Sequence, residues 1–178
     1  MLASALKEVA EHITFCAECF RSVERESPSP DPILCSFCHV ADGSSATLKR
    51  NQNQIAVVEK ESDLRNIEET RVYQGVYHVL GGVISGLDPE SPKKIHLREL
   101  YERVKKILEA GNACELILAT SATTEGDTTA LYIEKIMAPL KDAHPAFKIS
   151  RLGRGLSLGS ELEYADEMTI KNALNNRK

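Results

Sequence analysis

Four cysteines near the beginning of the chain have the spacing of a metal-binding module. Cys16 and Cys19 form one Cys-x2-Cys pair, and Cys35 and Cys38 form a second pair after fifteen further residues. Each pair can present two thiolates to one ion, and four thiolates complete the closed tetrahedral shell of a zinc site. Because a closed shell leaves no position for water, the pattern predicts one structural zinc ion. Four free thiols are the alternative.

Acidic side chains form a second candidate site. Glu59 ends the first apolar segment that has the character of a strand, and Asp63 follows one turn later. Glu125 and Asp127 flank a glycine shortly after the third such segment. Ligand sites form beyond the carboxyl ends of parallel strands, and carboxylates that converge there repel one another. This repulsion would raise the pKa of one of the carboxyl groups, or the carboxylates would attract a cation such as Mg²⁺.

Helix capping is a simpler explanation for part of this group. Thr124 and Asp127 match a capping box, and acidic residues in the first turn of a helix interact favourably with its dipole. Capping accounts for Asp127 and Glu125, but it does not account for Glu59 or Asp63. The sequence therefore leaves both interpretations open.

The other candidate residues have structural interpretations. Arg151 and Arg154 lie beside glycines near the acidic edge, where they could bind phosphate or pair with carboxylates, and we favour ion pairing. Cys114 stands at the start of an apolar strand, which is typical of a small buried hydrophobic residue. His78 lies inside another apolar strand and is interpreted as a core histidine.

Alternating strand and helix patterns position these side chains. Continuous apolar runs predict buried strands at residues 55–58, 76–80, 116–119 and 148–152. Helical spacing predicts helices after a Ser62 cap, then over residues 97–108, 128–140 and 165–175. In the third of these helices the candidate inner positions are Ala130, Leu131, Ile133, Ile136 and Met137. The alternation implies an α/β fold with a four-stranded parallel sheet, right-handed crossovers and flanking helices.

The segment before the sheet is different in character. Residues 2–13 have helical apolar spacing, and three prolines at alternate positions within residues 27–32 indicate an extended loop between the cysteine pairs. Residues 41–54 are polar and irregular, which is typical of a linker.

Composition limits the possible functions. A net charge of −4 argues against general binding of nucleic acid. We find no apolar stretch long enough to span a bilayer and no secretory leader, so the cytoplasm is the expected compartment. Thiols stay reduced there, and the five cysteines therefore indicate metal binding or packing.

Several segments together resemble the Toprim domain of the bacterial RecR recombination mediators. These are residues 55–59, 77–82, 84–85, 117–120 and 124–130. Residues 151–155 and 162–167 resemble the C-terminal segment of the same family, and a four-cysteine zinc module before the Toprim domain also agrees. On this resemblance we expect four parts in the chain. They are an N-terminal helix (residues 1–14), the zinc module (15–42), the Toprim domain (52–150) and a C-terminal segment with a helix (151–178).

The resemblance implies a non-catalytic role in recombinational DNA repair. RecR proteins act with RecO or RecF at single-strand gaps, help the RecA recombinase to displace single-strand binding protein, and assemble as rings that can encircle DNA. By motif position, Glu59, Glu125 and Asp127 would then belong to a face that engages RecO.

The sequence also departs from the family pattern. RecR proteins begin with a helix-hairpin-helix module that contacts DNA, whereas this sequence starts at the following helix, so we expect weak DNA binding and an assembly smaller than a ring. Gly86, Ser157 and the pair Ser121-Ala122 stand where proline is common, and the loop at residues 22–32 is longer than usual.

Two other functions stay open. A Mg²⁺-dependent Toprim nuclease, or a related phosphoryl-transfer enzyme, would use the carboxylates for catalysis. Against it, the chain is short and has Glu-x-Asp where catalytic Toprim proteins typically have paired aspartates. The other possibility is a zinc-stabilised protein-interaction module that does no work on DNA.

Overall fold

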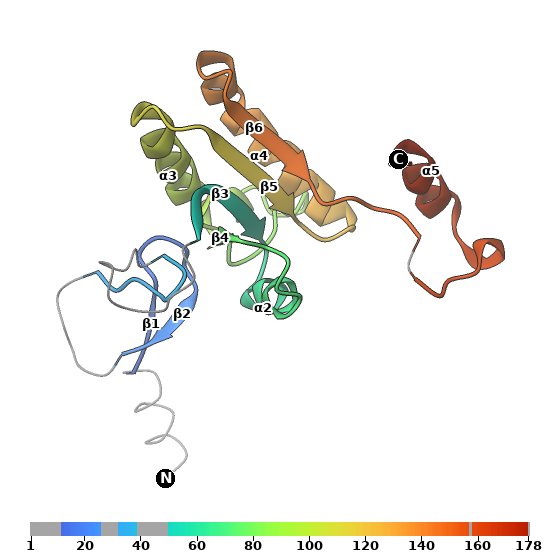
Figure 1. Ribbon diagram of the computed structural model, residues 1–178, viewed down its shortest axis with the longest axis horizontal. Helices are drawn as coiled ribbons and strands as arrows, with labels where there is room; N and C mark the ends of the chain where they lie inside the picture. Colours follow the sequence, from blue (N-terminus) through green and yellow to red (C-terminus); the bar gives the residue numbers. More distant parts are fainter. Residues whose placement is uncertain (1–11, 26–31, 39–49, 157, 178) are drawn as a thin grey trace, which may run out of the picture.

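A four-stranded parallel sheet forms the centre of the protein. The computed structural model describes residues 12–25, 32–38, 50–156 and 158–177. The strand order is β4–β3–β5–β6, which confirms the predicted parallel α/β sheet (Figure 1). The strands are β3 (Asn51–Val58), β4 (Gly75–Val79), β5 (Cys114–Ala119) and β6 (Phe147–Arg151).

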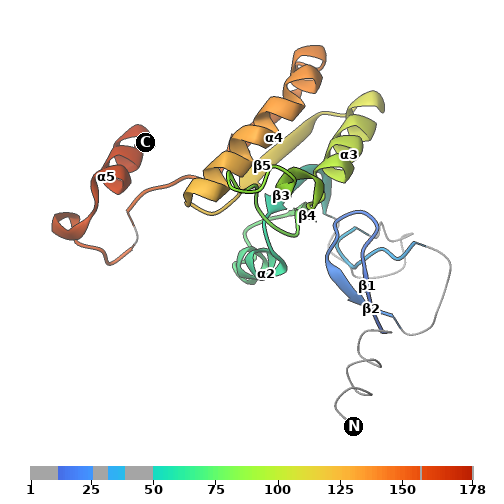
Figure 2. The same cartoon turned by 180° about the vertical axis from the view of Figure 1, so that it is seen from behind.

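Helices cover the sheet on both faces. Helix α2 (Glu61–Glu69) lies on one face, and α3 (Leu97–Glu109) and α4 (Thr124–Ala143) lie on the other (Figures 1 and 2). In the sheet, β4 lies on one side of β3, whereas β5 and β6 lie on its other side. Right-handed crossovers must therefore place α2 on one face of the sheet and α3 and α4 on the other face. The order of the strands therefore decides which face each helix covers.

Alternate residues of the central strand supply two separate cores. Ile55 and Val57 pack in the cluster formed with α3 and α4, whereas Ala56 and Val58 pack in the cluster that contains Leu64 of α2. This alternation follows from the two-residue repeat of a strand. Both faces are apolar because both are covered, as the continuous apolar run predicts.

Three details of the predicted helices are wrong. Helix α4 begins at Thr124, four residues early, because the side chain of Thr123 accepts a hydrogen bond from the amide of Gly126 at 3.1 Å and so caps the helix. Leu131, predicted as an inner residue, is 59% exposed. In α2 the N-cap residue is Lys60, so Ser62 lies inside the helix.

The cysteines lie in a small module beside the sheet, which we define as residues 12–25 and 32–38. It contains an antiparallel hairpin of β1 (Ile13–Phe15) and β2 (Ser22–Glu24). Ile13 is therefore in a strand and not in the predicted helix, whose residues 1–11 lie outside the described residues, as do 26–31 and 39–49. Residues 51–54, predicted as linker, begin β3, where Gln54 donates to the Glu115 carboxylate at 2.7 Å.

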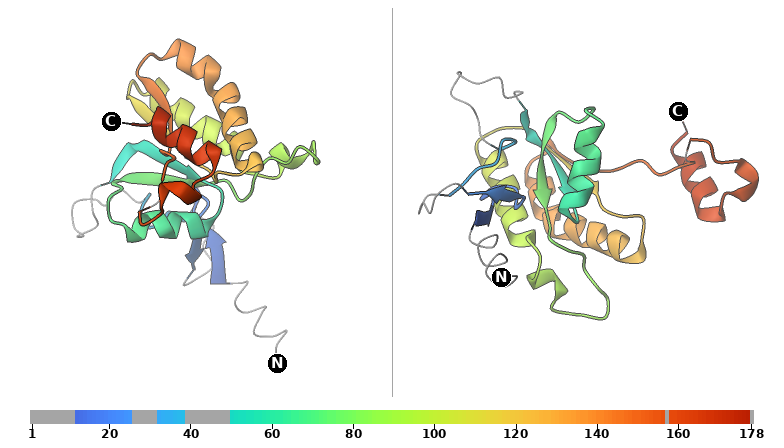
Figure 3. Two further views of the ribbon diagram at one scale, coloured as in Figure 1. Left: turned by 90° about the vertical axis from the view of Figure 1, so that its right-hand side faces the viewer. Right: turned by 90° about the horizontal axis from the view of Figure 1, so that it is seen from below.

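The chain after the sheet forms a C-terminal arm, residues 152–156 and 158–177. It contains η2 (Leu162–Tyr164) and α5 (Glu167–Asn175), and α5 stands apart from the sheet (Figures 1 and 3). Asn176 donates to the carbonyl of Arg154 at 2.8 Å, so the arm folds back on itself. Among the described residues, no helix has both the length and the apolar character needed to cross a bilayer.

The buried imidazole of His78 predicts a pH-dependent stability. Its Nε2 donates to the carbonyl oxygen of His96 at 2.8 Å, and burial lowers the pKa of His78 to about 3. An unfolded histidine takes up a proton near pH 6.5, so between about pH 6.5 and about pH 3 the unfolded state binds more protons. Stability is therefore lost as the pH falls through this window, by at most about 1.4 kcal/mol per pH unit.

The variant His78→Gln isolates this contribution. Glutamine can still donate to the His96 carbonyl but does not titrate, so we expect its free energy of unfolding to depend less on pH than that of the parent. Urea denaturation near neutral pH and at about pH 5 measures the difference. Equal pH dependence of the two proteins would contradict the neutral, buried state of His78.

Candidate metal centre and acidic edge

The four cysteine sulfurs meet at one point. Their Sγ atoms all lie within 4.8 Å of one another, and each cysteine is buried. A tetrahedral zinc ion with bonds of about 2.3 Å places its sulfur ligands roughly 3.8 Å apart, so the sulfurs are close to the spacing that one ion needs. The predicted four-cysteine cluster is confirmed, and among the described residues it is the one group of histidine, cysteine, aspartate or glutamate with metal-binding geometry.

Short backbone hydrogen bonds hold the cysteines in place. In the first pair the amide of Phe20 donates to the Cys16 carbonyl at 3.0 Å, and in the second the amide of Cys38 donates to the Cys35 carbonyl at 3.0 Å. The amide of Cys35 also points to the Cys16 sulfur at 3.4 Å. Backbone amides directed at sulfur favour the thiolate, which is the form that binds metal.

Aromatic residues next to the cysteines attach the module to the sheet. Phe20, which follows Cys19, stacks on His96 with ring centroids 3.9 Å apart. Phe37, which precedes Cys38, packs against Tyr77 of β4 at 5.7 Å. Sequence reasoning missed both contacts, although an aromatic residue beside a cysteine in each pair was a visible signal.

An acidic residue of α2 adds a polar contact to this docking. The amide of Ser22 donates to the Glu61 carboxylate at 3.1 Å, and the Ser22 hydroxyl contacts the same oxygen. Arg21 forms an ion pair with Glu61 at 3.7 Å. Although burial acts in the opposite direction, the hydrogen bonds from Ser22 hold the pKa of Glu61 below its ordinary value.

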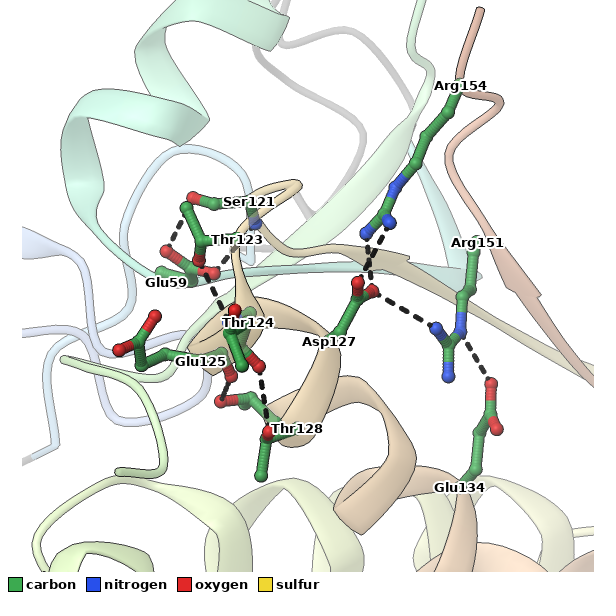
Figure 4. A network of polar contacts seen from close by, with 12 residues as sticks. Glu59, Ser121, Thr123, Thr124, Glu125, Asp127, Thr128, Glu134, Arg151 and Arg154 are labelled. Carbon is green, nitrogen blue, oxygen red and sulfur yellow. Dashed lines mark hydrogen bonds and ion pairs between the residues drawn. The ribbon is translucent and has the colours of Figure 1, made fainter. Parts of the chain in front are cut away.

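At the carboxyl edge of the sheet, Glu59 is a buried structural carboxylate. It is 4% exposed and accepts hydrogen bonds from the amide and the hydroxyl of Ser121, both at 2.7 Å (Figure 4). The end of β3 is thereby tied to the loop after β5. Gly126 packs closely against this loop, since an added Cβ would collide with the Ser121 carbonyl oxygen.

Asp127 is paired with both candidate arginines. Arg154 donates to its two carboxylate oxygens at 2.7 and 3.1 Å, and Arg151 lies 3.5 Å away (Figure 4). Arg151 also pairs with Glu134 at 2.8 Å. The hydrogen bonds from Arg154 hold the pKa of Asp127 below its ordinary value. The geometry thus gives the arginines carboxylate partners and joins α4 to the chain after β6.

The other two acidic residues have different surroundings. Glu125 is exposed, and Figure 4 draws no contact to its carboxylate. The Asp63 carboxylate accepts a hydrogen bond from the amide of Lys60 at 3.0 Å, which closes the first turn of α2. The four predicted acidic residues therefore lie along one edge of the sheet, but they do not gather within coordination distance of one ion.

Comparison with known proteins agrees with this architecture. A model of the Toprim domain matches residues 53–152, and a model described as RecR, C-terminal, matches residues 155–178. The recombination protein RecR of Cutibacterium acnes is 39% identical over 176 residues, which cover 99% of this chain and 76% of that protein. The chain belongs to the RecR family. RecR proteins of Frankia casuarinae and Prochlorococcus marinus are also 39% identical, with 77% and 76% of their lengths covered.

The two family models divide the chain where the structure does, between the sheet and the C-terminal arm. The Toprim match ends one residue after β6, and the match to the RecR C-terminal model covers η2 and α5 of the arm. Arg154 lies between the two matches, and its pair with Asp127 joins the arm to the Toprim domain. Cys114 lies inside the Toprim core, where burial raises the pKa of its thiol to about 11, consistent with the predicted hydrophobic role.

The acidic edge predicts different effects for two carboxylates. Glu59→Ala removes a buried carboxylate that accepts two hydrogen bonds from Ser121, and we expect a loss of about 1 to 3 kcal/mol in the free energy of unfolding. Glu59→Gln can keep both hydrogen bonds and should cost less. The exposed control Glu125→Ala should change stability by about 0.5 kcal/mol or less. Urea denaturation measures all three, and equal losses for Glu59→Ala and Glu125→Ala would contradict the structural role of Glu59.

Proposed function

We propose that the protein is a non-catalytic mediator of recombinational DNA repair that acts with RecO or RecF at single-strand gaps, where RecA is loaded. Its relatives are named recombination proteins, which supports the general role. The observation that carries the non-catalytic part is the state of the carboxyl edge. Glu59 accepts hydrogen bonds from Ser121, and Asp127 forms an ion pair with Arg154. Metal-dependent phosphoryl transfer needs carboxylates that are free to bind the ion.

We assign binding of the RecO partner to the same edge of the Toprim domain. Glu125 is exposed at the start of α4, and the loop before that helix, residues 121–123, is exposed as well. A rigid edge with an available carboxylate fits a partner that presents basic side chains. Direct DNA contact is then a minor part of binding by this chain, since its net charge is −4.

We also infer that the protein self-associates through the C-terminal arm. Seven apolar residues of the arm are at least 44% exposed, and another copy of the chain would remove them from water. They are Leu152, Leu156, Leu158, Leu162, Tyr164, Met168 and Leu174. None of the residues of α5 is buried within one chain, which supports the same conclusion.

One sedimentation experiment tests these proposals together. The chain alone should sediment faster than a monomer, and added RecO should form a heavier complex. Because like charges repel at an interface, Glu125→Lys should weaken this complex roughly tenfold or more, while Glu69→Lys at the far end of α2 should not.

A cleavage assay separates the mediator from an enzyme. Labelled single- and double-stranded DNA should stay intact with the chain and Mg²⁺ or Mn²⁺. Cleavage that Glu59→Gln abolishes would instead establish a Toprim nuclease. Absence of any complex with RecO or RecF would favour an interaction module without a role in DNA repair.

We further propose that the four cysteines hold a structural zinc ion. Four thiolates with tetrahedral spacing and no open position are the ligand set of structural zinc, and such an ion supplies folding energy to a module with little core of its own. In the module, the buried core consists of the cysteines themselves, with Val23 and Phe37 against them. Reduced thiols also fit a cytoplasmic location.

Removal of the metal should unfold the cysteine module and spare the sheet. The module contains Arg21 and Arg25, so trypsin should cut there after chelation, while sites within β3 to β6 stay protected by their own apolar core. Mass spectrometry of the fragments measures this, and added zinc should restore protection. If a chain shown to have lost its metal kept both arginine sites protected, the structural role would be wrong.

A further inference from the structure

Arg103 of α3 lies between the cysteine module and β4, and it contacts three parts of the protein at once. Its side chain is 9% exposed. Its Nη1 donates to the carbonyl oxygens of Glu18 at 3.1 Å and Tyr77 at 2.8 Å, and its Nε pairs with the Glu18 carboxylate at 3.3 Å. Its Nη2 points to the Cys38 sulfur at 3.9 Å. One guanidinium therefore joins the first cysteine pair, the second cysteine pair and β4.

The contact with Tyr77 matters because β4 is one of the two edge strands of the sheet. An edge strand has backbone groups without a partner strand, and these can pair with other chains unless they are covered. Groups outside the sheet cover this edge, namely Arg50 at the Gly75 carbonyl, Arg103 at the Tyr77 carbonyl, Cys19 at the Val79 amide and His96 at the Val79 carbonyl. The cysteine module and Arg103 thus complete the sheet.

The contact with Cys38 has an electrostatic consequence. Four thiolates around a divalent ion carry a net charge of about −2, which is costly to bury without compensation. Arg103 places a cationic donor beside one of these sulfurs, that of Cys38. A guanidinium keeps its charge at any physiological pH and binds several acceptors in one plane, so it suits this position.

We propose that Arg103 is a positioning residue that couples the metal site to the edge of the Toprim sheet. It offsets the charge of the thiolates and so slows loss of the ion. Through the Glu18 and Tyr77 carbonyls it also holds Cys19 against Val79, whose amide donates to the Cys19 carbonyl at 2.8 Å. Occupancy of the metal site and protection of β4 therefore change together. This inference rests on the proposed zinc ion.

Variants of Arg103 with a matched control test the coupling. Arg103→Gln removes the charge and most of the donors, Arg103→Lys keeps the charge but not the planar set of donors, and Arg98→Gln changes an exposed arginine on the same helix. Zinc content is measured first for the full chain. Release of zinc to a chromogenic chelator in excess then gives the dissociation rate, and hydrogen exchange of the Val79 amide reports on the edge of the sheet.

We expect release from Arg103→Gln to be roughly 10- to 100-fold faster than from the parent, with Arg103→Lys between them and Arg98→Gln unchanged. Exchange of the Val79 amide should accelerate in the same order. Equal release rates for Arg103→Gln and Arg98→Gln would overturn the proposal, as would faster release with no change at Val79.

Two further outcomes are distinguishable. A parent chain without zinc would refute the proposed metal and with it the coupling. If Arg103→Gln did not fold, Arg103→Lys, which retains a cation in the same place, would decide the matter by its release rate relative to Arg98→Gln.

Discussion

The unpaired edge of β4 is the constraint on which the arrangement of this protein depends. All five residues of β4 are buried, yet the strand has a neighbour in the sheet on one side only. The cysteine module supplies the missing side through the Cys19 carbonyl and the rings of Phe20 and Phe37. The module in turn lacks a large core of its own, so each part stabilises the other.

Contacts between distant residues also organise the carboxyl ends of the strands. A row of carboxylates follows β3 and β5, which is where a ligand site of a parallel sheet is found. Here Glu59 joins the end of β3 to the loop after β5 through Ser121, and Asp127 joins α4 to the chain after β6 through Arg154. Both carboxylates are thereby held in fixed positions by groups of the same chain. The edge is therefore rigid and acidic, properties that suit the binding of another protein.

Local patterns in the sequence were sufficient for most of the fold. The Cys-x2-Cys pairs, the four apolar strands and the helical stripe of α3 each depend on residues close together in the chain, and all are confirmed. The errors concern positions that neighbours in space decide. Leu131 has the spacing of an inner residue, but it is exposed on α4. Residues 51–54 are polar but extend β3, where Gln54 pairs with Glu115 of β5.

The sequence by itself determined the class of fold, the four-cysteine cluster and the list of acidic residues along one edge. Only the tertiary structure decided which carboxylate meets which partner and which cation lies beside the cysteine sulfurs. The reason is distance along the chain. Glu59 and Ser121 are 62 residues apart, and Arg103 and Cys38 are 65 residues apart, so no local pattern contains either pair. Right-handed crossovers and the edge of β4 bring them together.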